Sequence, residues 1–235
     1  MDIPFSNCLN YGFTQVYVLT QFNSVSLHSH ISSAYRFDGF SDSFVEILAA
    51  QQTPEDHGWY QGTADAVRQN LRYFLRPRYD YYLVLSGDQL YRMDYRKLLA
   101  GHLQSSADVT IATLPVSKEP AKGFGIMHTH NDGQITLFVE KPQQDKLLDY
   151  LKMPADMLSN SGIPNDSERY LASMGIYLFN RDTLEHYLDN DMVDFGKNVI
   201  PHVIKENKVM SHVFQGYWED IGTIGAFFKA NLDMA

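Results

Sequence analysis

The sequence predicts an α/β fold with a largely parallel sheet, on the strength of two observations. Strand-like segments rich in β-branched and aromatic residues alternate with helix-like segments, which is typical of a sheet covered by helices. Several apolar runs also end abruptly in charged residues, and ligands of open α/β sheets bind where strands end. The 235 residues, 44% of them apolar, are enough for one large domain.

The first half of the chain contains one helix with a clear pattern. Over residues 61–75, Val67, Leu71 and Phe74 lie on one helical face, and Asp65 near the start suits the helix dipole. The other expected elements here are strands 13–22, 43–52 and 79–88 and helices 23–35 and 94–106.

The second half continues the alternation after an interruption. Residues 117–169 are rich in Pro, Gly, Asn and Asp, so we expect loops or an inserted lid there. The expected elements are strands 107–116, 134–142, 170–180 and 209–222, helix 181–190 and a short helix after Thr223.

Composition excludes several classes of partner. The 19 Lys and Arg against 28 Asp and Glu give a net charge of −9 without a basic patch, so nucleic acid is not expected. No uncharged apolar run is long enough for a membrane span, and the first ten residues do not resemble a signal peptide. The single cysteine, Cys8, is expected to be a small buried residue, and its isolation fits a reducing, cytoplasmic environment.

Asp88 follows the apolar run of the segment LVLSGDQLYRMDY. A carboxylate at the end of such a strand can hold Mg²⁺, which prefers oxygen ligands and bridges to phosphates. It can equally cap a turn or the next helix, and the spacing leaves both readings open.

Glu219 and Asp220 follow the apolar run VMSHVF in the same way. Carboxylates from two distant strand ends can share one metal site. The alternative is a solvated turn before the last helix.

Lys141 is the candidate phosphate-binding cation. The segment LFVEKP carries an apolar strand into Glu140 and Lys141, and Pro142 ends the strand. A lysine there can neutralise a phosphate, although a surface lysine before proline is also common. Gly62 and Thr63 open a helix whose N–H groups could meet an anion, and Tyr60 beside them could stack on a ligand or belong to the core.

Taken in order, these segments resemble the glucose-1-phosphate adenylyltransferases, or ADP-glucose pyrophosphorylases, over nearly the whole chain. The wider superfamily of sugar-phosphate nucleotidyltransferases shares a looser pattern. The resemblance implies one catalytic domain over residues 1–235 with a Rossmann-like, mostly parallel sheet. The segments that carry it are DIPFSNCLN, WYQGTADAV, LSGDQLYRMDY, GFGIM, FVEKP, YLASMGIYLF, DFGKNVIPHVI and YWEDIGT.

The resemblance also implies a reaction and the roles of residues in it. A phosphate oxygen of glucose 1-phosphate would attack the α-phosphorus of ATP, giving ADP-glucose and pyrophosphate for glycogen-type synthesis. Asp88 and Asp220 would hold Mg²⁺, and Lys141 would bind the sugar phosphate. The remaining implied positions are Glu140 on the sugar hydroxyls, Tyr60, Gly125 and Ser173 along the sugar-phosphate site, and Gly62 and Thr63 near the nucleotide.

Two parts of the family pattern have no counterpart in this sequence. The family's first strand and its Gly-rich, Arg-containing loop would precede the text matched at Met1, and its C-terminal β-helix domain would follow residue 235. We therefore expect residues 1–235 alone to have little activity, and the full-length form to be a homo-oligomer. A non-catalytic regulatory or assembly subunit, or an enzyme that uses another nucleotide or sugar, are the alternative readings.

Overall fold

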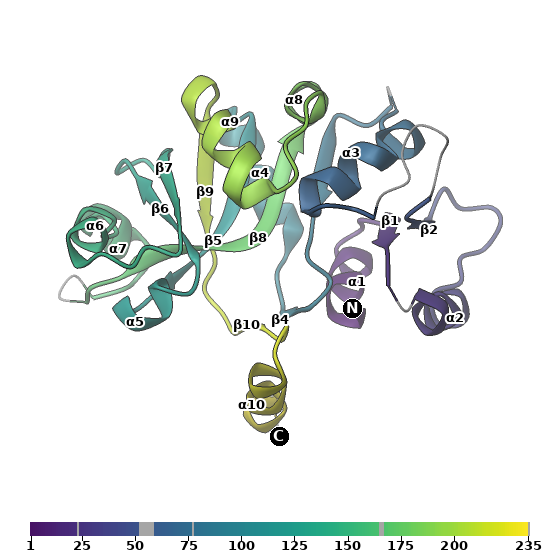
Figure 1. Cartoon of the computed structure of the whole chain (residues 1–235), viewed down its shortest axis with the longest axis horizontal. Coiled ribbons are helices and arrows are strands. Elements are labelled where there is room, and N and C mark those ends of the chain that lie inside the picture. The colour runs from purple at the N-terminus through teal and green to yellow at the C-terminus, as the bar shows by residue number, and fades with distance from the viewer. Residues whose placement is uncertain (23, 52–58, 77, 165–166, 235) are drawn as a thin grey trace.

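The computed structural model describes residues 1–22, 24–51, 59–76, 78–164 and 167–234. Its main sheet has the strand order β7-β6-β8-β5-β9, with β3 also paired to β8 (Figure 1). The α/β class predicted from the sequence is confirmed. The strands of this sheet are β3 Tyr81–Val84, β5 Val109–Val116, β6 Gly125–Thr129, β7 Ile135–Glu140, β8 Tyr170–Asn180 and β9 Val209–Val213.

The expected predominance of parallel strands is wrong. Among the described strands only β1 with β2 and β5 with β9 run parallel. β8 is antiparallel to β3, β5 and β6, and β6 forms a hairpin with β7. The segment 117–169, expected to be loops or a lid apart from strand 134–142, supplies that hairpin: β7 confirms the expected strand, and β6 was not expected. Strands joined by a short turn must be antiparallel.

Two small sheets lie outside the main one. β1 (Gln15–Thr20) pairs with β2 (Phe44–Ala49), and β4 (Gln89–Tyr91) pairs with β10 (Trp218–Asp220). The single strand expected over 209–222 is therefore two strands in different sheets, β9 and β10. Residues 23 and 52, at the ends of two expected elements, and 165–166 lie outside the described residues.

Helices cover both faces of the sheet because both faces are apolar. On one face α3 (Thr63–Phe74), α8 (Arg181–Leu188) and α9 (Ile200–Glu206) pack against β3, β5 and β8. On the other face α1 (Asp2–Asn10) and α4 (Tyr95–Ser105) pack against β8. The remaining helices are α2 Ser24–Ala34, α5 Lys118–Ala121, α6 Asp145–Tyr150, α7 Ala155–Asn160, the π-helix η1 Phe195–Val199 and α10 Ile224–Met234, which projects from the β4–β10 pair (Figure 1).

The helix expected over 61–75 is confirmed as α3, and 170–180 is β8. Helices α1, η1 and α9 were not expected. Within the described ranges, no helix combines the length and apolar character needed to cross a bilayer.

Leu98 tests the packing of α4 against the sheet. It is completely buried, whereas Leu103 on the same helix is 50% exposed. We expect Leu98→Ala to lower the free energy of unfolding by about 2–5 kcal/mol, because it leaves a cavity. Leu103→Ala should change it by less than about 0.5 kcal/mol. Urea unfolding of both variants measures this, and equal effects would contradict the packing described.

Candidate active site

The pairing of β4 with β10 brings Asp88 and Asp220 together. Ile221 donates its backbone N–H to the Asp88 carbonyl oxygen over 3.0 Å, and Asp220 lies opposite Gln89 in the ladder. Asp220 Oδ1 lies 3.0 Å and Asp88 Oδ2 lies 3.7 Å from the position that a Cβ atom on Gly222 would occupy. The two exposed carboxylates are therefore close neighbours on one surface.

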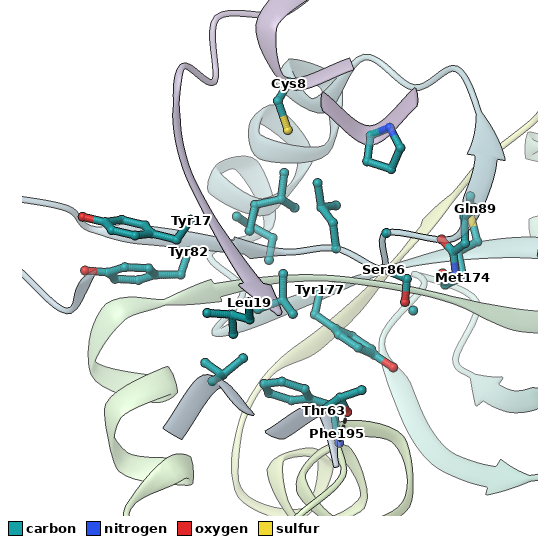
Figure 2. A pocket seen from close by; sticks show the side chains of 18 of the residues that line it. Cys8, Tyr17, Leu19, Thr63, Tyr82, Ser86, Gln89, Met174, Tyr177 and Phe195 are labelled. Carbon is teal, nitrogen blue, oxygen red and sulfur yellow. Dashed lines mark hydrogen bonds between the residues drawn. The ribbon is translucent and has the colours of Figure 1, made fainter. Parts of the chain in front are cut away.

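These carboxylates stand at the edge of a cavity of about 1210 Å³. Its walls are mainly apolar side chains of β1, β3, β8, α1 and α3, part of which Figure 2 shows. None of the described residues that line it is Lys or Arg. Its charged lining residues are four acids, Asp88, Glu140, Asp194 and Asp220.

The end of β7 places Glu140 in the cavity wall but leaves Lys141 outside it. Lys141 is exposed, and its backbone has a φ of 47°, a conformation uncommon for a residue with a side chain. Its N–H donates to the Phe124 carbonyl oxygen over 3.0 Å. Ser106, which ends α4, is the other non-glycine residue with a positive φ in the described part of the chain.

Gly125 lies beside Glu140 because the two residues pair in the β6–β7 ladder. A Cβ there would lie 2.3 Å from Phe138 Cζ and 3.0 Å from Glu140 Oε2. Because Gly125 has no side chain, the side chains of Phe138 and Glu140 can pack against the backbone of β6.

A bulge in β8 turns Ser173 toward the cavity. The pairing with β5 changes register around Gly175, whose φ is 68°. The Ser173 hydroxyl accepts a hydrogen bond from Gly175 N–H over 3.2 Å. Bulges often re-aim side chains next to active sites, and a glycine within a strand is the sequence signal for one.

Tyr177 follows Ser173 and the bulge along β8, and it was not predicted from the sequence. It lines the cavity, and burial raises the pKa of its phenol to about 12. That pKa already includes a hydrogen bond from Ser173, which lowers it, and the negative charges of Asp194 and Glu140, which raise it. Its hydroxyl is therefore neutral at physiological pH and can donate to a ligand.

The turn at 61–63 is clamped to the segment before η1. A Cβ on Gly62 would lie 2.3 Å from the Val193 carbonyl oxygen, which accepts the N–H groups of Ala64 and Asp65. Phe195 N–H donates to Thr63 Oγ1 over 3.3 Å. Thr63 lines the cavity, and Gly62 does not.

Tyr60 lies away from the cavity. Its hydroxyl accepts a hydrogen bond from Asn70 Nδ2 over 2.8 Å, and its backbone N–H donates to Gln21 Oε1. Burial raises the pKa of this phenol. The structure thus groups Asp88, Asp220, Glu140, Gly125, Ser173 and Thr63 around one cavity, but not Tyr60, Gly62 or Lys141.

Three further cavity residues were missed in the sequence. Asp194 caps η1 by accepting Lys197 N–H over 2.9 Å, and π-helices frequently occur at functional sites. Gln89 Oε1 and Trp218 Nε1 are buried and, within the described part of the chain, have no hydrogen-bond partner. An acceptor and a donor without partners fit a polar ligand, because buried polar groups are normally paired.

A metal ion would find few protein ligands here. Among the described residues, no group of three or more His, Cys, Asp and Glu side chains is arranged to hold one. Asp88 and Asp220 could supply two oxygens. Mg²⁺ is typically held by one or two carboxylates, with water and phosphate oxygens completing its shell, so the pair fits that ion.

Comparison with known proteins agrees with this architecture. The crystal structure of HddC from Yersinia pseudotuberculosis superposes with a TM-score of 0.69 at 16% sequence identity, covering 98% of this chain and 83% of that one. At this identity the likeness concerns the fold. The model of the nucleotidyl transferase family matches residues 1–235. The chain belongs to the nucleotidyl transferase family.

Proposed function

We propose that this protein transfers a nucleotidyl group from a nucleoside triphosphate to a sugar 1-phosphate. The observation that carries the proposal is the meeting of Asp88 and Asp220 at the edge of a large cavity, in a chain of the nucleotidyl transferase family. Transfer to a phosphate needs positioning and charge neutralisation rather than a covalent intermediate. A phosphate oxygen of the sugar 1-phosphate attacks the α-phosphorus of the nucleoside triphosphate. The bond from that phosphorus to the oxygen that bridges to the β-phosphate breaks, and pyrophosphate leaves.

The chain's own residues have separate tasks in this proposal. Asp88 and Asp220 hold Mg²⁺, which when bound offsets negative charge on the phosphate oxygens. Lys141 binds the sugar phosphate, and Glu140 accepts hydrogen bonds from the sugar hydroxyls. Gly125 and Ser173 shape the sugar-phosphate side, and Thr63 lies on the nucleotide side. Tyr60, Gly62 and Lys141 do not line the cavity, so their support is the sequence motif and, for Lys141, its position directly after Glu140.

ATP and glucose 1-phosphate are the proposed substrates, and ADP-glucose the proposed product. The eight sequence segments shared with glucose-1-phosphate adenylyltransferases support this choice. Pyrophosphate release with ATP, UTP, GTP and dTTP in turn tests it. Preference for another nucleotide would keep the reaction class and overturn the substrate.

A non-catalytic regulatory or assembly subunit is the second candidate. One observation favours it: the described residues that line the cavity provide four carboxylates and no Lys or Arg for the phosphates. Binding of labelled glucose 1-phosphate without turnover, by this chain and by a form with the family's Gly-rich, Arg-containing loop fused upstream of Met1, would support that reading.

Asp88→Asn tests the metal-binding role in the form carrying that upstream loop. The change keeps the shape of the side chain but removes its charge. We expect the rate of pyrophosphate release to fall at least about 100-fold, corresponding to about 2.7 kcal/mol of barrier. Asp182→Asn, at an exposed position on α8, is the matched control and should keep the rate. A near-normal rate for Asp88→Asn at saturating Mg²⁺ would remove Asp88 from the mechanism.

Lys141→Ala tests the recognition of the sugar phosphate in the same form. We expect the KM for glucose 1-phosphate to rise much more than the KM for ATP, because the lost charge faces one substrate. Lys205→Ala, an exposed lysine on α9, should leave both values unchanged. Equal increases in both KM values, or a change in kcat alone, would contradict phosphate binding as the main role of Lys141.

A further inference from the structure

Asp65 is a charged side chain in a buried place. It is the third residue of α3 and only 2% exposed, so the helix dipole that suits it explains its position only in part. Its Oδ2 accepts the Gln61 backbone N–H over 2.7 Å and Gln69 Nε2 over 3.1 Å. Its Oδ1 accepts Arg68 Nη2. A buried carboxylate needs an opposite charge beside it, and Arg68 supplies that charge.

Arg68 joins this carboxylate to a second segment of the chain. Its Nη1 donates to the Met192 carbonyl oxygen over 2.8 Å, while its Nη2 is paired with Asp65. The Arg68 side chain is 26% exposed, so water screens the pair less than it would on an open surface. The planar guanidinium carries donors on two terminal nitrogens, which lets it hold two acceptors at once. The bridge therefore ties the start of α3 to the segment before η1.

Arg68 makes this contact although other acids line the same hollow. It lines a second cavity of about 660 Å³ together with Glu185, Asp189 and Asp191, which are all exposed. Within the described part of the chain, however, its ion pair is with Asp65. An arginine that only balanced surface charge would have three acids in open solvent as partners. The observed pairing indicates that Arg68 serves the buried carboxylate and the segment bonded to it.

The two segments that Arg68 joins form one wall of the main cavity. After Met192, the Val193 carbonyl oxygen accepts two N–H groups of the first turn of α3 over 2.9 Å and 3.1 Å. Phe195 N–H donates to Thr63 Oγ1. Asp194 lies between these two anchors and lines the cavity together with Thr63. The position of the Asp194 carboxylate therefore depends on the contact that Arg68 fastens.

We propose that Arg68 is a positioning residue that fastens the start of α3 to the segment before η1 and so holds Thr63 and Asp194 in place on the cavity wall. Arg68 itself does not line the cavity, so it would not touch a substrate bound there. The consequence for binding rests on the proposed function. Asp194 and Glu140 are both close enough to Tyr177 for their charges to act on it, which puts Asp194 on the sugar-phosphate side. A loosened wall should therefore bind glucose 1-phosphate more weakly.

Arg68→Lys separates the bridge from the charge in the 235-residue protein. Lysine keeps a positive charge for the carboxylate but has one terminal nitrogen, so it cannot reproduce both bonds of the guanidinium. The reporters are the three amides that bond across the contact, those of Ala64, Asp65 and Phe195. By nuclear magnetic resonance, we expect their hydrogen exchange to speed up about tenfold or more, the scale of one hydrogen bond to a charged group. Arg72→Lys, at an exposed position on the same helix, should leave these rates unchanged.

Urea unfolding of the same variants distinguishes positioning from support of the fold. Arg68→Met leaves the Asp65 carboxylate buried without a cation, so we expect its unfolding midpoint to fall. Arg68→Lys should recover most of that loss without slowing the three amides. Slow exchange in Arg68→Lys would reduce Arg68 to a charge partner and overturn the proposal. If Arg68→Met does not fold, the double variant Asp65→Asn/Arg68→Met removes both charges, and slow exchange in it would overturn the proposal equally.

Binding of labelled glucose 1-phosphate to the 235-residue protein connects the bridge with function. We expect Arg68→Lys to raise the dissociation constant about fivefold or more, as for the loss of one hydrogen bond to the ligand, and Arg72→Lys to leave it unchanged. Fast exchange in Arg68→Lys with an unchanged dissociation constant would overturn the positioning role. If the unmodified protein does not bind glucose 1-phosphate at millimolar concentration, the proposed sugar-phosphate site is wrong. The exchange rates alone then decide whether Arg68 holds the wall.

Discussion

The sheet and the candidate site both depend on the central strand β8. Its eleven residues pair with β5 along one edge and with β3 and β6 along the other. Side chains on both of its faces are buried, which explains its nearly continuous apolar sequence. The bulge at Gly175 interrupts this regularity. Gln89 Nε2 and Ser86 Oγ lie 3.3 Å and 3.4 Å from the position that a Cβ atom on Gly175 would occupy. The same irregularity therefore fixes the β3–β4 turn and directs Ser173 into the cavity.

The proposed metal site depends on a much shorter pair of strands. β4 and β10 are three-residue strands far apart in the sequence, and their pairing sets Asp88 beside Asp220. Gln89 strengthens this corner by donating its Nε2 to the Met174 carbonyl oxygen over 2.7 Å. Because the ladder is so short, the geometry of the two carboxylates relies on the packing of Trp218 and Phe124, whose ring centroids are 5.4 Å apart. The rigid sheet and the exposed carboxylates are thus linked through a few buried contacts.

Local pattern predicted the elements that carry their own periodicity. The helix at 61–75 and the strand at 170–180 were found because their apolar spacing and length need no knowledge of partners. The run 209–222 failed because its alternation is the same whether one strand or two are formed, and only tertiary pairing separates β9 from β10. Asp88 and Asp220 were located by the apolar runs before them, whereas Tyr177 and Asp194 become visible only when β8 and η1 are folded against one cavity.

The location of a bound divalent ion tests most directly whether Asp88 and Asp220 share one metal site. Mn²⁺ broadens the nuclear magnetic resonance signals of nearby amides, so titration of the 235-residue protein with Mn²⁺ alone reports the site. We expect the broadening to centre on Gly87, Ile221 and Gly222 and to be lost in Asp220→Asn, whereas Asp182→Asn retains it. Broadening centred elsewhere, or unchanged in Asp220→Asn, would contradict a metal site shared by Asp88 and Asp220.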